Sequence, residues 1–138
     1  MRFNTSSIAP ADKIADVAKT VLIVDDNAHL RRILASNLEF FGYQTLGAGT
    51  GTEAIEKAIS AKPNLILMDL DLPDITGIET AKAIKKNPTT AHIPIIACSA
   101  SFGPECREEA LRAGMVDYLQ KPVQAKVIKA KIEQFILP

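Results

Sequence analysis

Several residue types that commonly indicate a particular chemistry or location are scarce in this sequence. Tryptophan is absent, and the two cysteines, Cys98 and Cys106, lack the spacing of metal ligands. No apolar run approaches the roughly 20 residues of a membrane span, and the N-terminus lacks the apolar core of a secretory signal. We therefore expect a cytoplasmic protein with no membrane partner, whose thiols are reduced and take no part in catalysis.

An excess of charge of either sign is also missing. The 138 residues include 16 Lys and Arg and 16 Asp and Glu. Without a global field, the chain has no general attraction for nucleic acid or for an anionic membrane surface, so we expect no direct nucleic-acid binding. Any chemistry on a phosphate would have to use local charges. The length and an apolar content of 47% fit a single globular domain.

The most informative stretch is residues 65–77, with the sequence LILMDLDLPDITG. A four-residue apolar run leads directly to Asp69 and then breaks into a turn that contains Pro73 and Gly77. An apolar run with almost no alternation is typical of a strand buried on both faces in a parallel sheet. Ligands of such sheets bind where the strands end. Asp69 is therefore predicted to lie at a site of chemistry.

Similar apolar segments alternate with helical patterns along the rest of the chain. The sequence predicts strands at residues 21–24, 43–46, 65–68, 93–98 and 116–119, each followed by a helix. The short connections require right-handed crossovers, which gives an α/β fold with a five-stranded parallel sheet covered on both faces. Strand order is not encoded in the periodicity, and we expect the common doubly wound order 2-1-3-4-5.

The predicted boundaries and helix faces can be stated residue by residue. Residues 20–138 are expected to form the domain, and residues 1–19 an N-terminal arm that is partly disordered or carries one short helix. In the helix that begins at Pro104, Ala110 and Leu111 are expected to face the core. In the last helix, three lysines are expected to face solvent: Lys126, Lys129 and Lys131.

Every predicted strand except the second ends in a polar residue: Asp25 with Asp26, Asp69, Ser99 and Lys121. The expected strand order brings the three carboxylates into one crevice, where repulsion would raise at least one pKa unless a cation joins them. Oxygen ligands of this kind suit Mg²⁺ or Mn²⁺. Lys121 supplies a point charge for an anion, and the Ser99 hydroxyl can donate to it. With such neutralisation, Asp69 can attack a phosphoryl group in line and form an acyl phosphate.

With these residues in place, residues 20–137 resemble the receiver domain of two-component response regulators. The resemblance implies a flavodoxin-like (βα)5 fold. It also implies a role for each matching position. Asp69 in MDLDLPDITG would be the phosphoacceptor, Asp25 and Asp26 the acidic pair that binds metal, and the backbone carbonyl of Asp71 a further metal ligand. Ser99 in ACSA would be the hydroxyl switch, Tyr118 the aromatic rotamer switch, and Lys121, before Pro122, the lysine of the family's site.

The function implied by the resemblance is a phosphorylation switch. A phosphohistidine on a sensor kinase or a phosphotransfer protein would donate to Asp69 with Mg²⁺ or Mn²⁺, and output would pass to an unknown protein through the fourth helix, fifth strand and fifth helix. The protein would not be an enzyme beyond catalysing its own phosphorylation and autodephosphorylation, and a homodimer is allowed. Met1 favours a stand-alone regulator over a receiver excised from a hybrid kinase or multidomain regulator, and both readings stay open.

The sequence departs slightly from the family's usual pattern. Ser99 stands where Thr is commoner, which keeps the hydroxyl but drops a methyl group. Asp71 and Ser101 occupy two places at which family members tune the lifetime of the acyl phosphate. The resemblance therefore leaves that lifetime open.

Two other protein classes share parts of this pattern. Asp69 and Asp71 resemble the nucleophile motif of haloacid-dehalogenase-type phosphatases, but in those enzymes the motif lies on an early strand, whereas here an acidic pair precedes it. A flavodoxin-like redox protein would share the sheet, but its phosphate loop after the first strand would be repelled by Asp25 and Asp26. Sustained phosphate-ester turnover would indicate the first class, and bound flavin the second.

Overall fold

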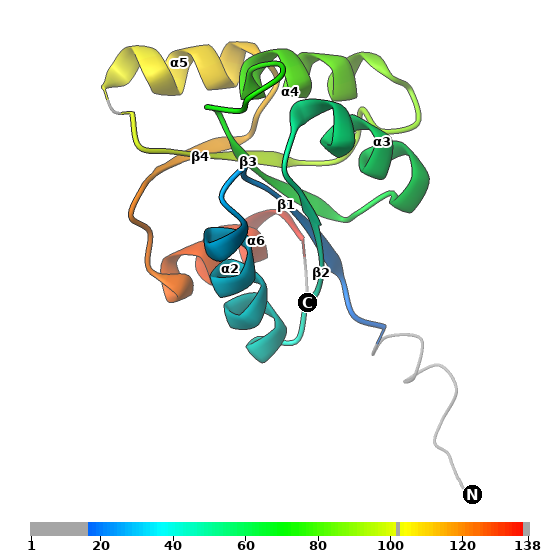
Figure 1. Cartoon of the computed structure of the whole chain (residues 1–138), viewed down its shortest axis with the longest axis vertical. Coiled ribbons are helices and arrows are strands. Elements are labelled where there is room, and N and C mark those ends of the chain that lie inside the picture. The colour runs from blue at the N-terminus through cyan, green and yellow to red at the C-terminus, as the bar shows by residue number, and fades with distance from the viewer. Residues whose placement is uncertain (1–16, 102, 137–138) are drawn as a thin grey trace, which may run out of the picture.

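The computed structural model describes residues 17–101 and 103–136 of the chain. Within these ranges, five parallel strands form one sheet in the order β2-β1-β3-β4-β5, and five helices cover it (Figure 1). The strands are β1 Thr20–Val24, β2 Gln44–Ala48, β3 Leu65–Asp69, β4 Ile95–Ser99 and β5 Asp117–Gln120. The helices are α2 Ala28–Phe40, α3 Gly51–Ala61, α4 Gly77–Lys86, α5 Pro104–Arg112 and α6 Ala125–Phe135. The predicted α/β doubly wound fold and its strand order are confirmed.

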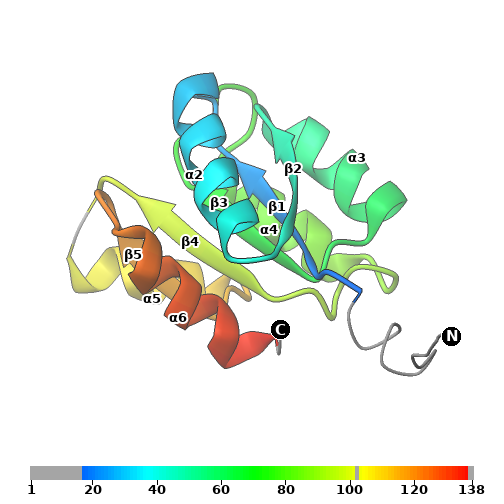
Figure 2. The same ribbon diagram turned by 90° about the horizontal axis from the view of Figure 1, so that it is seen from below.

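The helices form two layers, one on each face of the sheet. Helices α2 and α6 cover one face, and α3, α4 and α5 cover the other (Figure 1 and Figure 2). The apolar core is divided in the same way: Leu22 and Ile66 belong to one cluster, and Val21 and Leu65 to the other. Every residue of β3 is buried, so its sequence shows almost no alternation.

The strand boundaries differ from the prediction by a residue or two. β4 begins at Ile95 and not at Ile93, because Pro94 between them has no N–H for the ladder. The carbonyl oxygen of Pro94 still accepts a hydrogen bond from the N–H of Ile66 at 3.0 Å. β2 and β5 each begin one residue later than predicted.

Two expectations about helix faces need correction. Leu111 was expected to face the core, but its side chain is 41% exposed, whereas its neighbour Ala110 is fully buried. Adjacent helical residues point about 100° apart, so one can face the sheet while its neighbour faces solvent.

Lys126 is exposed as expected, but Lys129 and Lys131 are only partly exposed and are held by ion pairs. The Nζ of Lys129 lies 2.8 Å from Oε2 of Glu133, and the Nζ of Lys131 lies 2.9 Å from Oδ2 of Asp117.

The predicted N-terminal arm lies mostly outside the described residues, which begin at residue 17. Residues 17–19 are not helical, and the carbonyl of Lys19 accepts a hydrogen bond from the N–H of Gln44, which aligns the starts of β1 and β2. Among the helices of the described ranges, none combines the length and apolarity that crossing a bilayer would require.

The turn after β3 is packed too tightly at Gly77 for any side chain. The N–H of Gly77 donates to the carbonyl of Leu70 at 2.9 Å. A Cβ added at Gly77 would lie 2.7 Å from the Cα of Leu70 and closer still to the carbonyl oxygen of Asp69. Helix α4 then begins with a capping box between Thr76 and Glu79. These contacts fix the path of the chain as it leaves Asp69.

We predict that Gly77→Ala lowers the free energy of unfolding by about 2 kcal/mol, because overpacking against backbone outweighs the roughly 1 kcal/mol that alanine gains over glycine in a helix. Urea denaturation followed by circular dichroism measures the change. Gly47→Ala is the matched control, since its added Cβ would meet only the flexible side chain of Arg31 at 3.4 Å. The control should shift stability by less than about 0.5 kcal/mol. Equal losses in the two variants would contradict the packing at Gly77.

Candidate functional site

Three carboxylates meet where β1 and β3 end. The two strands are parallel neighbours with Val24 opposite Met68, so the residues that follow them, Asp25 and Asp69, lie side by side. One oxygen from each of Asp25, Asp26 and Asp69 lies within 4.8 Å of the others. Asp25 and Asp69 are only 3% and 6% exposed, whereas Asp26 is exposed. The structure thus brings together the three acids predicted to share one crevice.

The backbone and carboxylate of Asp25 are fixed by several hydrogen bonds. Its N–H donates to the carbonyl of Ala48 at 3.0 Å, and its own carbonyl accepts from Nη1 of Arg31 at 2.5 Å. Its Oδ1 accepts from the N–H of Asn27 at 2.9 Å. The side chain of Asn27 in turn caps the N-terminus of α2. The loop carrying the acidic pair is therefore held by both β2 and α2.

Lys121 connects two of the three acids. Its Nζ donates to Oδ2 of Asp25 at 2.7 Å and lies 3.5 Å from Oδ2 of Asp69. Its backbone N–H donates to the carbonyl of Ser99 at 2.8 Å, which fixes the residue at the end of β5. Burial disfavours the charged amine, but the hydrogen bond to Asp25 and the charges of Asp69 and Asp25 outweigh it and raise the pKa of Lys121. The amine therefore stays protonated.

The carboxyl group of Asp69 lies in an environment that disfavours its charge. Burial is the main cause that raises the pKa of Asp69, and the neighbouring charges of Asp25 and Asp71 act in the same direction. The N–H of Asp71, which donates to Oδ1 of Asp69 at 3.2 Å, and the charge of Lys121 oppose this only in part. One lysine does not compensate three acids. A donor set of this kind fits a hard divalent cation.

Ser99 is the last residue of β4, and Tyr118 lies within the neighbouring strand β5. Ser99 is fully buried, and its Oγ accepts a hydrogen bond from the N–H of Ser101 at 3.2 Å. The half-buried ring of Tyr118 places its hydroxyl against the carbonyl of Ser101, to which it donates. Burial, with Cys106 nearby, raises the pKa of Tyr118, so its hydroxyl remains a donor. Both predicted switch residues therefore contact the segment that follows β4.

The surroundings of Cys98 disfavour a reactive thiol. It lies in β4 beside the site and is 6% exposed. Burial raises the pKa of Cys98 to about 12, so the nucleophilic thiolate is disfavoured. The prediction that this thiol is not catalytic agrees with its environment.

Sequence reasoning missed a second charged cluster next to Tyr118. Asp117, which is 5% exposed, accepts a hydrogen bond from Nη1 of Arg107 on α5 at 2.9 Å and lies 2.9 Å from Nζ of Lys131 on α6. Burial would raise the pKa of Asp117, but the bonds from Lys131, the N–H of Tyr118 and Arg107 together lower it. An acid within a predicted apolar strand was a signal, but the sequence does not reveal its partners.

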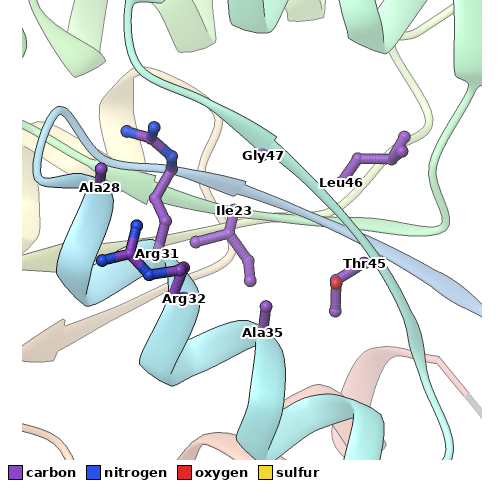
Figure 3. Close-up of a pocket in the computed structure, with 8 residues that line it drawn as sticks. All are labelled: Ile23, Ala28, Arg31, Arg32, Ala35, Thr45, Leu46 and Gly47. Atoms are coloured by element: carbon purple, nitrogen blue, oxygen red, sulfur yellow. The ribbon is translucent and has the colours of Figure 1, made fainter.

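A cavity of about 230 Å³ lies between α2 and β2. Ile23 and Ala35 form part of its apolar wall, and Arg31 and Arg32 extend from α2 along one side (Figure 3). Arg31 is the residue that also donates to the carbonyl of Asp25. None of the predicted site residues lines this cavity.

The sequence is similar to those of known proteins over most of its length. The model for the response regulator receiver domain matches residues 21–133. The chain is 38% identical over 117 residues to the phosphate regulon transcriptional regulatory protein PhoB of Pseudomonas aeruginosa, covering 85% of this chain and 51% of PhoB. It therefore spans about half the length of that relative. It is 34% identical over 119 residues to the polar-differentiation response regulator DivK of Brucella anthropi, covering 86% of this chain and 96% of DivK.

Solved structures show the same likeness. The chemotaxis protein CheY4 of Vibrio cholerae aligns with a TM-score of 0.83 and 28% identity over 87% of this chain and all of that one. The receiver domain of a sensor histidine kinase from Pseudomonas aeruginosa, solved with a magnesium ion in its active-site cleft, aligns with a TM-score of 0.80 and 28% identity over 86% of this chain and 98% of that one. Because the family model covers most of the sequence and the fold and relatives agree with it, this chain belongs to the response regulator receiver domain family, whose members are signalling switches and not classical enzymes.

Proposed function

We propose that Asp69 accepts the phosphoryl group in this receiver domain. The observation that carries the proposal is the environment of its carboxylate, which is buried, has a raised pKa, and lies between two further acids and Lys121. A carboxylate whose negative charge is poorly compensated is stabilised by a ligand that brings positive charge, or by forming a covalent bond that removes the charge from its oxygen. The haloacid-dehalogenase alternative is not favoured, because the family match is to receiver domains.

The metal proposed for this site is Mg²⁺, with Mn²⁺ as a substitute. Asp25, Asp26, Asp69 and the backbone carbonyl of Asp71 would hold it, as the resemblance implies. When bound, it would supply positive charge to the phosphoryl oxygens. The acidic cluster fits such a cation because it offers oxygen ligands only and carries more negative charge than Lys121 offsets.

The residues of the chain have separate tasks in the proposed transfer. An oxygen of Asp69 attacks the phosphorus of a phosphohistidine, the new P–O bond forms as the N–P bond breaks, and the imidazole nitrogen leaves with the electron pair. Lys121, protonated and already next to Asp69, attracts a phosphoryl oxygen. The Ser99 hydroxyl donates to another oxygen. Attack of water on the phosphorus of the acyl phosphate would break its bond to Asp69, release inorganic phosphate and return the free carboxylate.

Phosphorylation would then be read by Ser99 and Tyr118. As the Ser99 hydroxyl moves toward the phosphoryl group, Tyr118 would leave the carbonyl of Ser101 and turn into the space vacated. This change would alter the surface formed by α5, β5 and α6, where Asp117 joins the two helices. The family acts with histidine kinases or phosphotransfer proteins, and we propose such a protein as the donor and an unidentified protein as the receiver of output.

We also propose the division of the chain that the sequence suggested. Residues 20–138 would be the receiver unit and residues 1–19 an arm that precedes it. The start of β1 at Thr20 supports this boundary.

Incubation with acetyl phosphate or phosphoramidate and Mg²⁺ should add one phosphoryl group, detected as a mass increase of the intact protein. Asp69→Asn should abolish the adduct because the acceptor oxygen is lost, and so should EDTA added before the donor. Asp71→Asn is the matched control: it keeps the backbone carbonyl and should retain the adduct. An adduct that persists in Asp69→Asn would remove Asp69 from the proposed role, and an adduct that forms in EDTA would contradict the proposed cation.

Asp69→Asn should also stabilise the protein in the absence of divalent cations. Because the folded pKa of Asp69 is raised, protonation stabilises the fold, and that stability is lost as the pH rises through the folded pKa. The neutral amide of Asp69→Asn carries no charge at any pH and so does not lose this stability. At pH 7 we expect the free energy of unfolding of the variant to exceed that of the wild type by about 1 kcal/mol, and this difference should shrink as the pH falls.

Urea denaturation at several pH values measures this difference. Glu56→Gln removes one charge from an exposed position and should change stability by less than about 0.5 kcal/mol at each pH. Added Mg²⁺ should stabilise the wild type more than Asp69→Asn, because only the wild type keeps all three acids. A pH-independent difference between Asp69→Asn and wild type would show that burial of the charge is not its cause.

A further inference from the structure

Asp74 links the loop that follows Asp69 to a different helix. Its Oδ1 accepts a hydrogen bond from the N–H of Gly51 at 2.8 Å, and its Oδ2 accepts from the N–H and the hydroxyl of Thr52 at 3.0 and 2.5 Å. Gly51 and Thr52 are the first two residues of α3, more than twenty residues earlier in the chain. One carboxylate of the acceptor loop thus binds the N-terminus of α3.

This contact satisfies N–H groups that α3 leaves open. The first N–H groups of a helix have no partner within it, and a carboxylate there is stabilised by the helix dipole. The helix's own cap, the hydroxyl of Thr50, accepts only from the N–H of Glu53. The hydrogen bonds from Thr52 and its neighbours hold the pKa of Asp74 well below its usual range, so the link is a charged one.

The loop and the helix are also packed closely at this point. Gly51 is buried, and a Cβ added to it would lie 2.5 Å from Cγ1 of Ile75 and closer still to the hydroxyl of Thr80. The close packing of Ile75 and Thr80 against Gly51 therefore leaves little room for the loop to shift while the carboxylate of Asp74 is bound to α3. Removing the carboxylate would release this constraint.

The loop has two other fixed points, one at each end. The N–H of Asp71 donates to Oδ1 of Asp69, and the N–H of Gly77 donates to the carbonyl of Leu70. Between them, the side chain of Asp74 joins the loop to α3 by hydrogen bonds. β2, which leads into α3, also contacts the acidic pair, because the carbonyl of its last residue, Ala48, accepts from the N–H of Asp25. The two loops that carry the acids are thus connected through the N-terminus of α3.

We propose that Asp74 is a positioning residue for the cation at this site: by holding the acceptor loop against α3, it keeps the backbone carbonyl of Asp71 in place beside the acidic cluster. Asp74 itself touches neither the cation nor the phosphoryl group. The inference rests on the proposed function for the identity of the site. Loss of the hydrogen bonds from Asp74 to α3 should weaken binding of the cation and leave the rate of phosphoryl transfer unchanged once the cation site is saturated.

The first test compares Asp74→Ala with Thr50→Ala. Both variants remove a cap from the same helix and should lower the melting temperature by a similar few degrees. Only Asp74→Ala should weaken Mg²⁺ binding, by roughly tenfold, as is common when a residue that orients a metal ligand is lost. The dissociation constant is measured by titrating MgCl₂ into ¹⁵N-labelled protein with no phosphoryl donor present. Thr50→Ala should stay within about twofold of the wild type.

A second measurement separates binding from chemistry. In Asp74→Ala, the rate of phosphorylation by acetyl phosphate should reach half its maximum at a roughly tenfold higher Mg²⁺ concentration, with the maximal rate within about twofold of the wild type. Asp74→Asn keeps one acceptor oxygen and should lie between Asp74→Ala and the wild type. A lower maximal rate with unchanged half-saturation would overturn the positioning role.

The other end of the link gives an independent test. Thr52→Val keeps the shape of the side chain but removes the hydroxyl that donates to Asp74. It should weaken Mg²⁺ binding in the same direction by a smaller factor, and it should add little to Asp74→Ala, because both changes break one link. If Asp74→Ala does not fold, Thr52→Val and Asp74→Asn decide the question.

The outcomes separate this inference from the proposed function. Mg²⁺ binding that is equal in Asp74→Ala and the wild type overturns the inference, even if Asp69 is phosphorylated normally. Weaker Mg²⁺ binding in Asp74→Ala, with no variant or wild type forming an adduct, supports the positioning role and overturns the proposed phosphoryl transfer. Equal weakening in Asp74→Ala and Thr50→Ala would assign the effect to the stability of α3 alone.

Discussion

The ion pair from Lys121 to Asp25, extended to Asp69, is the interaction on which the site depends. Three acids within 4.8 Å of one another would repel strongly without it, and two of them are buried. Lys121 directly follows β5, which is separated from β3 by β4, so its side chain crosses the end of β4 to reach the acids. The hydrogen bond from its N–H to Ser99 fixes where that crossing begins. The sheet therefore determines which charges meet.

Most of the fold could be predicted because its three central strands, β1, β3 and β4, are buried on both faces. The apolar run of β3 is unbroken since helices cover both sides of it, and the acid at its end marks the edge where parallel strands finish. The placement of Asp25, Asp69 and Lys121 at one edge follows from that rule alone. Strand order came from the commonest doubly wound arrangement and not from the pattern of residues, so it needed the structure to confirm it.

What could not be predicted depends on how helices are turned and on which distant residues meet. The burial of Ala110 and the exposure of Leu111 differ because a helix presents neighbouring residues in different directions, and the pattern did not fix that rotation. The partners of Asp117 lie on two separate helices. Asp74 was visible as a loop acid, but only the structure shows that its carboxylate caps α3. Long-range polar contacts of this kind leave no periodic signal.

Three aspartates of this domain show how surroundings, and not residue type, determine the state of a carboxylate. The pKa values of Asp74 and Asp117 are lowered because N–H, hydroxyl and cationic donors surround their charge. The pKa of Asp69 is raised because burial and neighbouring acids outweigh one N–H and one amine. Asp74 fixes the loop that follows Asp69, and Asp117 joins α5 to α6, and the hydrogen-bonding groups of both carboxylates are satisfied. Among the three, only the negative charge of Asp69 is poorly compensated by its neighbours. The tendency to bind a cation or to form a covalent bond is therefore concentrated at the point where the loops after β1 and β3 meet Lys121.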